Sequence, residues 1–279
     1  MIKTNYHTHT LYCDGKNSPE EVILSAIEKK FDILGFSGHS MYPFAEDWHI
    51  SPKQINDYVT EIKTLAEKYK DHISILCGFE ADYIPGITEP TFSNYEKFNP
   101  DYLIGSVHYI ATPKGIMAVD GKPEDIKTGI DKLFNKNAKK AVCEYFYLQR
   151  EMIKKCDFTI LGHPDLFRKE NERLNLFNES DSWYKNEIKA LAKEIAKKGI
   201  ITEVNTGAIT RKKMNDVYPS AFFLNLLKEY NVPITISSDA HSANDLDGAF
   251  ETAIDSIKKA GYSEVAYLNS SCKIQFQKI

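Results

Sequence analysis

Seven short apolar segments, each separated from the next by a longer stretch, are the feature of this sequence that most restricts its fold. The segments are 3–6, 33–37, 73–79, 102–107, 158–161, 200–204 and 234–237. They are almost continuously apolar or aromatic, which is typical of strands covered on both faces. Strands that alternate with helices pair in parallel through crossover connections. We therefore predict an α/β fold, and we favour a closed or nearly closed barrel over a doubly wound open sheet.

The intervening stretches carry helix signals. Ser18 is followed by proline and, three residues after it, by Glu21, which is the pattern of a capped helix start. Ser51 is also followed by proline, so a second helix is expected from there to Tyr69. A third apolar stripe begins near residue 183 and closes at Gly199, a residue type that often follows a helix end. Two further helices are predicted over 219–227 and 244–260.

Length and composition agree with one domain over residues 1–279. The chain has 279 residues, close to the roughly 250 of a (β/α) barrel, and no linker divides it. Lys and Arg total 35 and Asp and Glu total 39, a net charge of −4 that argues against extended nucleic-acid binding. No apolar run approaches the roughly 18 residues of a membrane span. The five cysteines form no CxxC pair, so we expect free thiols in a cytoplasmic protein.

Six of the eight histidines stand just after a predicted strand. They are His7 and His9 after the first strand, His39 after the second, His108 after the fourth, His163 after the fifth and His241 after the seventh. Glu80 and Asp239 occupy equivalent places after the third and seventh strands, and Asp14 follows the first pair of histidines. The carboxyl ends of barrel strands meet at one rim, where active sites form. These side chains are therefore expected to converge.

Imidazole and carboxylate groups are ligands for zinc, iron and manganese. His7 and His9 project to the same side of an extended chain, and Asp239 and His241 have the same spacing. Each residue alone could be structural, and the joint pattern carries the interpretation. Nine candidate ligands are too many for one ion, so we predict two or three divalent metal ions (Zn, Fe or Mn). Polynuclear sites with metals about 3.5–4 Å apart are typical of enzymes that hydrolyse phosphate esters.

The motifs around these residues resemble the polymerase-and-histidinol-phosphatase (PHP) superfamily. They are His7-Thr8-His9-Thr10, Asp14-Gly15, Gly38-His39-Ser40, Gly78-Phe79-Glu80, Ser106-Val107-His108, Gly162-His163-Pro164-Asp165 and Ser238-Asp239-Ala240-His241. The phrases at 163–166 and 203–206 are similar to those of the stand-alone histidinol-phosphate phosphatases. The superfamily commonly has Asp-His where this chain has Gly38-His39, which puts the orientation of His39 in question.

The resemblance implies a distorted (β/α)7 TIM-like barrel of the PHP type with a trinuclear centre of zinc, iron or manganese. It implies hydrolysis of L-histidinol phosphate to L-histidinol and phosphate in histidine biosynthesis. The metal ligands carry over to His7, His9, Asp14, His39, Glu80, His108, His163, Asp239 and His241. We expect attack by a metal-bridging hydroxide, with Asp239 or His241 as the catalytic group that protonates the leaving alkoxide.

Arginine offers planar, bidentate donors for the phosphate group. Of the four arginines, Arg168 follows the fifth strand and Arg211 the sixth, so both are expected to bind the substrate. The phosphatases that the chain resembles similarly place arginines in these loops. The loop 41–49, Tyr109 and Met117 are candidates for contacts with the imidazole ring.

Three alternatives remain open from the sequence. The first is another phosphoesterase on the same scaffold, such as a protein-tyrosine phosphatase or a nucleotide or DNA phosphodiesterase. The second is an amidohydrolase, although such sites commonly use a bridging lysine and no lysine stands at a strand end here. The third is a non-enzymatic metal-binding protein. We expect the partner to be a small phosphomonoester rather than a membrane or a nucleic acid, and the oligomeric state is left open.

Overall fold

Seven parallel strands form the central sheet of the protein, a computed structural model of which describes residues 2–40 and 47–279. In spatial order they are β1 (Thr4–Asn5), β2 (Ile33–Phe36), β3 (Ser74–Asp82), β4 (Tyr102–Ser106), β7 (Ile160–Leu161), β8 (Ile201–Asn205) and β9 (Ile234–Ser237). Each strand of this sheet lies beside the sheet strand that precedes it in the chain, and every pairing is parallel. All seven predicted segments are confirmed as strands.

The chain beyond β1 closes the sheet against the chain beyond β9. Thr8 and Ala240 form a parallel bridge. The backbone N–H of His9 donates to the carbonyl of Ala240 (2.9 Å), and that of Ala240 donates to the carbonyl of His7 (3.1 Å). The sheet is therefore a nearly closed barrel. This confirms the predicted fold class and excludes the doubly wound open sheet.

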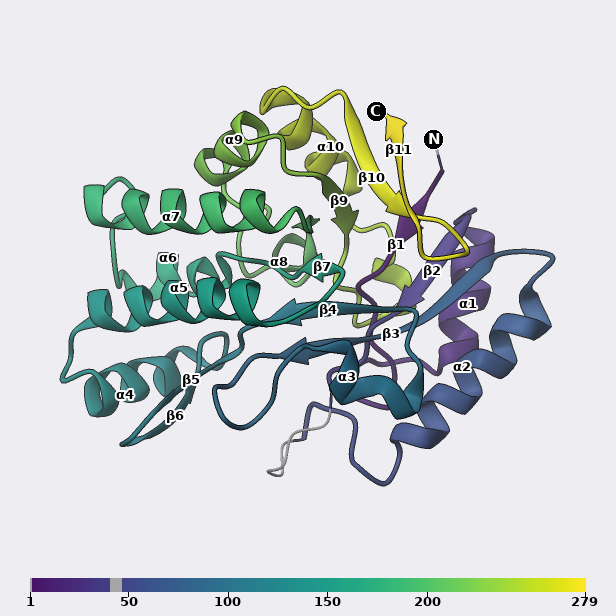
Figure 1. The fold of residues 1–279 in the computed structure, drawn as a ribbon, viewed down its shortest axis with the longest axis horizontal. Coiled ribbons are helices and arrows are strands. Elements are labelled where there is room, and N and C mark those ends of the chain that lie inside the picture. The colour runs from purple at the N-terminus through teal and green to yellow at the C-terminus, as the bar shows by residue number, and fades with distance from the viewer. Residues whose placement is uncertain (1, 41–46) are drawn as a thin grey trace.

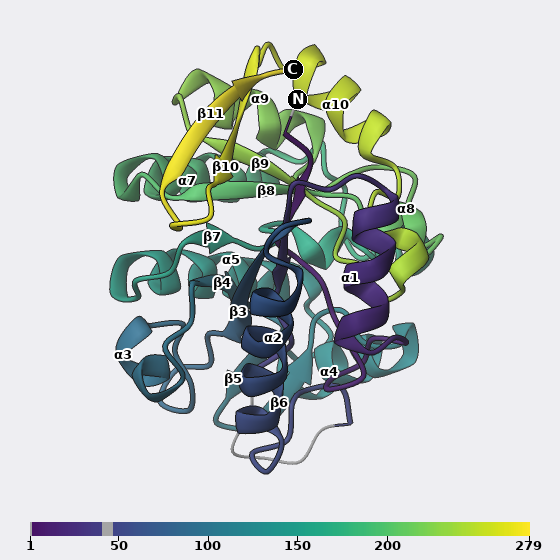
Figure 2. The ribbon, with the colours of Figure 1, turned by 90° about the vertical axis from the view of Figure 1, so that its right-hand side faces the viewer.

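Helices surround the barrel (Figures 1 and 2). The longer ones are α1 (Pro19–Glu28), α2 (Ile55–Tyr69), α4 (Pro123–Leu133), α5 (Ala138–Lys155), α7 (Ser182–Lys198), α9 (Ala221–Glu229) and α10 (Phe250–Lys259). The short ones are α3 (Phe92–Tyr95), α6 (Asn171–Leu174), α8 (Gly207–Thr210) and the 3-10 turns η1 (Glu96–Phe98), η2 (Leu166–Arg168) and η3 (Ala243–Asp245). Helices α4 and α5 lie in a stretch where no helix was identified from the sequence. Among the described residues, no helix has the length and apolar character needed to cross a membrane.

Two hairpins lie outside the barrel sheet. The first, β5 (Tyr109–Thr112) with β6 (Gly115–Ala118), follows β4 directly. The second, β10 (Glu264–Leu268) with β11 (Ile274–Lys278), lies beside the amino terminus in Figure 1. The Tyr6 hydroxyl donates to the carbonyl of Leu268 (2.9 Å) and accepts from its N–H (2.8 Å). Ala266 and Leu268 of this hairpin pack in one buried cluster with the first residues of β2, β4, β7 and β8, so the hairpin covers the barrel interior at the end opposite the carboxyl ends of the strands.

Two of the predicted helix boundaries are confirmed. Ser18 caps α1, because its hydroxyl accepts from the N–H of Glu21 and the Glu21 carboxylate accepts from the N–H of Ser18. Helix α7 ends at Lys198 and is capped by Gly199, whose φ of 73° is in the left-handed region that glycine adopts without strain. Both boundaries are set by residues that are close in sequence, so they could be predicted without knowledge of tertiary contacts.

Other predicted boundaries are wrong. Helix α2 begins at Ile55, and the hydroxyl of Ser51 donates to the Gln54 side chain instead of capping it. The helix predicted over 219–227 is shifted to α9. The stretch 244–260 holds η3 and α10 rather than one helix, because Ala249 has a φ of 58°. Next to it, the carbonyl of Gly248 accepts from the hydroxyl of Thr206 (2.6 Å). This long-range contact is not visible in the local pattern.

Candidate metal centre

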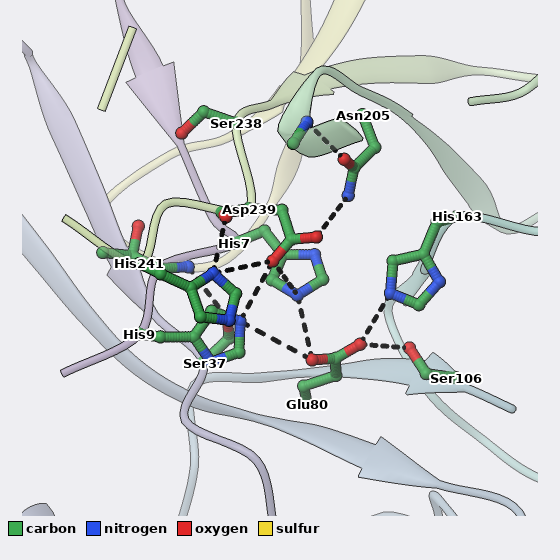
Figure 3. A network of polar contacts seen from close by, with 12 residues as sticks. His7, His9, Ser37, Glu80, Ser106, His163, Asn205, Ser238, Asp239 and His241 are labelled. Atoms are coloured by element: carbon green, nitrogen blue, oxygen red, sulfur yellow. Dashed lines mark hydrogen bonds and ion pairs between the residues drawn. The ribbon is translucent and has the colours of Figure 1, made fainter. Parts of the chain in front are cut away.

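The nine predicted ligands come together at the carboxyl ends of the strands. Figure 3 shows His7, His9, Glu80, His163, Asp239 and His241 of this set. Glu80 lies on β3, and the others lie in the connections that follow strands. They form groups in which every donor atom lies within 4.8 Å of the others, and Glu203 is added to the predicted set. The groups are His9, Asp14, His39 and His241; His7, His9 and Asp239; His7, His163 and Glu203; and His39, Glu80 and His108.

Glu80 stands at the centre of this cluster. Its Oε2 lies 3.0 Å from Nε2 of His7 and 3.0 Å from Nδ1 of His39. Its Oε1 lies 2.9 Å from Nε2 of His163 and 3.3 Å from Nε2 of His108. Oε2 also lies 3.7 Å from Nε2 of His9, so the two carboxylate oxygens face different sets of histidines. Glu80 could therefore share bound metal ions with histidines on both sides of the cluster.

A second carboxylate, Asp239, serves the other half of the cluster. Its Oδ1 lies 3.3 Å from Nε2 of His9 and 3.6 Å from Nε2 of His7. Asp14 lies nearer the surface, where its Oδ2 is 3.0 Å from Nε2 of His241. The His-x-His and Asp-x-His pairs therefore face one another across the site, as the alternation of side chains along an extended chain predicts.

Two further carboxylates contact the Nδ1 atoms of candidate ligand histidines. The sequence analysis gave them no role. Oε2 of Glu203 lies 2.9 Å from Nδ1 of His7. Oδ2 of Asp82 lies 2.9 Å from Nδ1 of His108. A carboxylate on one ring nitrogen fixes the ring orientation and leaves the other nitrogen for a metal. The available signal was their place inside strands β8 and β3, where an unpaired carboxylate would be costly.

Burial and neighbouring charges raise the pKa of some of these groups and lower the pKa of others. Burial alone would lower the pKa of His7, but the carboxylates of Glu203 and Glu80 raise it well above its usual value. Burial lowers the pKa of His9 to about 3, and the nearby His241 acts in the same direction. His9 is therefore a neutral imidazole, the form that binds a metal ion. The surrounding histidines hold the pKa of Glu80 well below its usual value despite its burial.

The buried polar atoms test whether this donor set fits metal ions. Nε2 of His7 and Oε2 of Glu80 lie 3.0 Å apart, yet neither of them, nor Nε2 of His9, has a partner with hydrogen-bond geometry among the described residues, and all three are buried. Buried polar atoms are normally satisfied, so a set of such atoms pointing together indicates a missing ligand. Nitrogen and oxygen donors of this kind suit zinc, iron and manganese. The residues present thus fit a centre of divalent metal ions.

A cavity of about 300 Å³ opens beside the cluster. Its lining includes metal-ligand candidates together with Trp48, Asp120, Lys169 and Arg211. Nη2 of Arg211 lies 2.8 Å from Oδ2 of Asp239, and its Nη1 donates to the carbonyl of the same residue (2.7 Å). Arg211 therefore presents a guanidinium group at the edge of the candidate metal centre.

The structure does not bring Arg168 to this cavity. Nε of Arg168 lies 2.9 Å from Oε2 of Glu179, and Nη2 lies 2.8 Å from Oδ2 of Asp216. Its Nη1 donates to the carbonyl of Val217 (3.2 Å). Because all three nitrogens bind protein acceptors, the expected substrate-binding role of Arg168 has no support. The next residue, Lys169, lines the cavity instead.

Only some of the residues expected to contact the imidazole ring of the substrate lie at the cavity. Residues 41–46 of the loop 41–49 lie outside the described residues. Trp48 lines the cavity and stacks on Tyr109, with ring centroids 5.7 Å apart at 23°. His49 is buried but is not a lining residue. Met117 belongs to the hydrophobic core, so its expected role is not supported.

Comparison with known proteins agrees with this fold and shows the family. Residues 5–207 match the family model of the PHP domain, and the chain belongs to this family. The family resemblance drawn from the sequence motifs is therefore confirmed.

Similar proteins cover nearly the whole chain. A Schizosaccharomyces pombe protein named "Probable histidinol-phosphatase" is 29% identical over 96% of this chain and 89% of its own length. A Bacillus subtilis protein named "Histidinol-phosphatase" is 25% identical over 91% of this chain and 99% of its own length. A histidinol phosphate phosphatase structure from Lactococcus lactis, in complex with zinc, L-histidinol and phosphate, has a TM-score of 0.73 at 22% identity. The alignment covers 98% of this chain and 99% of that one, and it supports the fold.

Proposed function

We propose that this protein is a metal-dependent phosphomonoesterase that hydrolyses L-histidinol phosphate to L-histidinol and phosphate, a step of histidine biosynthesis. The observation that carries the proposal is the cluster of nine ligand candidates beside a cavity that holds the guanidinium of Arg211. The names of the S. pombe and B. subtilis relatives support the choice of substrate.

We place two or three ions of zinc, iron or manganese in the cluster. His7, His9, Asp14, His39, Glu80, His108, His163, Asp239 and His241 would hold them. Bound divalent ions would supply Lewis acidity for attack by water and neutralise charge on the phosphate group. The zinc in the L. lactis structure supports this class of ion.

The residues of the chain itself would bind and orient the ester. Arg211 can hold a phosphate oxygen while its contacts with Asp239 keep its guanidinium in place. The leaving alkoxide would receive a proton from Asp239 or from His241. The side chain of His241 is 19% exposed and that of Asp239 is 7% exposed, so His241 is the more accessible of the two.

The size of the cavity favours a small ester over a polymer. A volume of about 300 Å³ is at the small end of the range for ligand sites, roughly 300–1,000 Å³. A phosphodiester in a nucleic acid would need an extended basic groove, which the net charge of −4 does not favour. The guanidinium at the cavity distinguishes the site from that of a protein that only stores metal.

A single assay tests the proposal. Phosphate release would be measured from L-histidinol phosphate, tyrosine phosphate and bis-p-nitrophenyl phosphate, with and without a chelator. We expect turnover of histidinol phosphate at least 100-fold above the other two, loss of activity with chelator and recovery with added metal. Preference for tyrosine phosphate or the diester, or activity that survives removal of all metal, would contradict it.

A further inference from the structure

Asp120 faces the cavity from the segment after the β5–β6 hairpin. The N–H of the preceding residue, Val119, donates to the carbonyl of His108 (2.8 Å), which ties this segment to the candidate metal centre. Asp120 lines the same cavity as His163 and Arg211. Its side chain is 29% exposed. The carboxylate therefore forms part of the cavity wall.

Lys169 holds the Asp120 carboxylate in position. The Lys169 ammonium group lies 3.3 Å from Oδ2 of Asp120 and donates to its backbone carbonyl at 3.1 Å. The Asp120 carboxylate is an anion at neutral pH, as aspartates ordinarily are, and Lys169 is its ion-pair partner. Its other oxygen, Oδ1, has no hydrogen-bond partner among residues 2–40 and 47–279, and it can accept from a ligand.

Asp120 also differs from the other acidic residues of the cavity. Four carboxylates line it: Asp14, Glu80, Asp120 and Asp239. Three of them belong to the groups of candidate metal ligands, and Asp120 does not. Bound metal ions would therefore leave Asp120 as the one lining carboxylate in the described structure outside the metal-ligand groups; Lys169 pairs with its Oδ2, and its Oδ1 remains open to a ligand.

The proposed substrate carries a charge that needs such a partner. In L-histidinol phosphate an ammonium group stands on the carbon next to the ester carbon. When the phosphate binds at the metal centre and Arg211, this ammonium must enter the same cavity. A cation that leaves water without a partner loses solvation free energy that only a close anion restores.

Resting on the function proposed above, we propose that Asp120 binds the ammonium group of the substrate. The residue thereby makes the enzyme selective for phosphomonoesters of 2-amino alcohols. Lys169 is a positioning residue in this arrangement, because it acts through Asp120.

The decisive comparison uses two substrates that differ only in the amine, L-histidinol phosphate and 3-(imidazol-4-yl)propyl phosphate. We expect Asp120→Asn to lower kcat/KM for histidinol phosphate roughly 10- to 100-fold, the range for a charged hydrogen bond. The amine-free ester should change by less than about threefold, and bound metal should stay at the wild-type level. Asp216→Asn is the matched control, because its carboxylate pairs with Arg168 away from the cavity.

A second pair, 2-aminoethyl phosphate and ethyl phosphate, separates this inference from the proposed function. If the wild type hydrolyses neither imidazole ester but prefers 2-aminoethyl phosphate, and Asp120→Asn removes that preference, the histidinol assignment fails and the ammonium site stands. Lys169→Met should weaken the preference for the amine less than Asp120→Asn does, because it removes the partner that positions the carboxylate but keeps the carboxylate itself. An Asp120→Asn variant that keeps the preference in both pairs, or loses activity equally on all esters, would overturn the inference. Hydrolysis of none of the four esters would overturn both proposals.

Discussion

The carboxylate of Glu203 lies 2.9 Å from Nδ1 of His7, and both side chains are fully buried. The opposite nitrogen of the His7 ring, Nε2, points at Glu80 (Figure 3). The ring is thus oriented by the protein before any metal binds. Asp82 holds His108 in the same way. Two candidate ligands are therefore supported by carboxylates that are not among the nine ligands predicted from the sequence.

Replacing Glu203 with glutamine should weaken metal binding. Loss of a carboxylate behind a ligating histidine typically reduces metal affinity 10- to 100-fold, and Glu203→Gln removes the charge while keeping the side-chain shape. Competition of zinc between the protein and a chromophoric chelator measures the change. Glu187→Gln, which affects a peripheral pair with Arg150, should bind zinc as the wild type does. Wild-type affinity in Glu203→Gln would refute the orienting role.

Replacing Arg211 with methionine should reduce turnover without removing metal. We expect kcat/KM for histidinol phosphate to fall roughly 100- to 1,000-fold, as for loss of a donor that stabilises transition-state charge. Elemental analysis of the same sample should give the wild-type metal content. A metal content that falls together with activity would instead make Arg211 a support for Asp239, to which it is bound. Arg150→Met is the control for loss of an arginine outside the site.

Replacing Arg168 with methionine should affect stability more than substrate binding. In the wild type, Nη1 of Arg168 lies 3.5 Å from Oδ2 of the buried Asp165. The variant leaves this carboxylate without its cationic neighbour. Removing one member of a buried ion pair costs about 3–5 kcal/mol in the free energy of unfolding. Urea denaturation measures this loss, and KM of the folded variant should stay within about twofold. A stable variant with a greatly raised KM would restore the substrate-binding role expected from the sequence.

Stability should depend on pH through Asp165. Burial raises the pKa of Asp165 to about 6, although Arg168 and the N–H of Ser220 act in the opposite direction. Because the pKa is raised in the folded state, the stabilising contribution of the protonated carboxyl is complete below about pH 4 and disappears as pH rises through 6. Between pH 4 and 7 the free energy of unfolding of the wild type should fall by about 2 kcal/mol relative to Asp165→Asn.

Urea denaturation of the two proteins across this pH range, both kept metal-free with chelator, measures that difference. The comparison with Asp165→Asn cancels the contributions of the other titrating groups. A difference that is constant with pH would show that Asp165 titrates at its usual value.

The positions of the barrel strands and of the candidate ligands followed from the sequence. Continuous apolar segments indicate buried strands, and the carboxyl ends of parallel strands share one rim. His7, His108 and His241 could therefore be expected together although 100 residues or more separate consecutive members of this set. The Ser18 cap and the Gly199 end of α7 were also predictable, because each is decided by a few neighbouring residues.

Only the tertiary structure decided which groups support the site and which arginine faces it. Arg168 and Arg211 stand in similar loops, but one guanidinium meets Glu179 and Asp216 and the other meets Asp239. The direction of a long side chain depends on hydrogen-bond acceptors that other elements bring near it. These acceptors cannot be inferred from the local sequence pattern. The pairing of Glu203 with His7 has the same origin, because β8 and the chain beyond β1 come together only when the barrel closes.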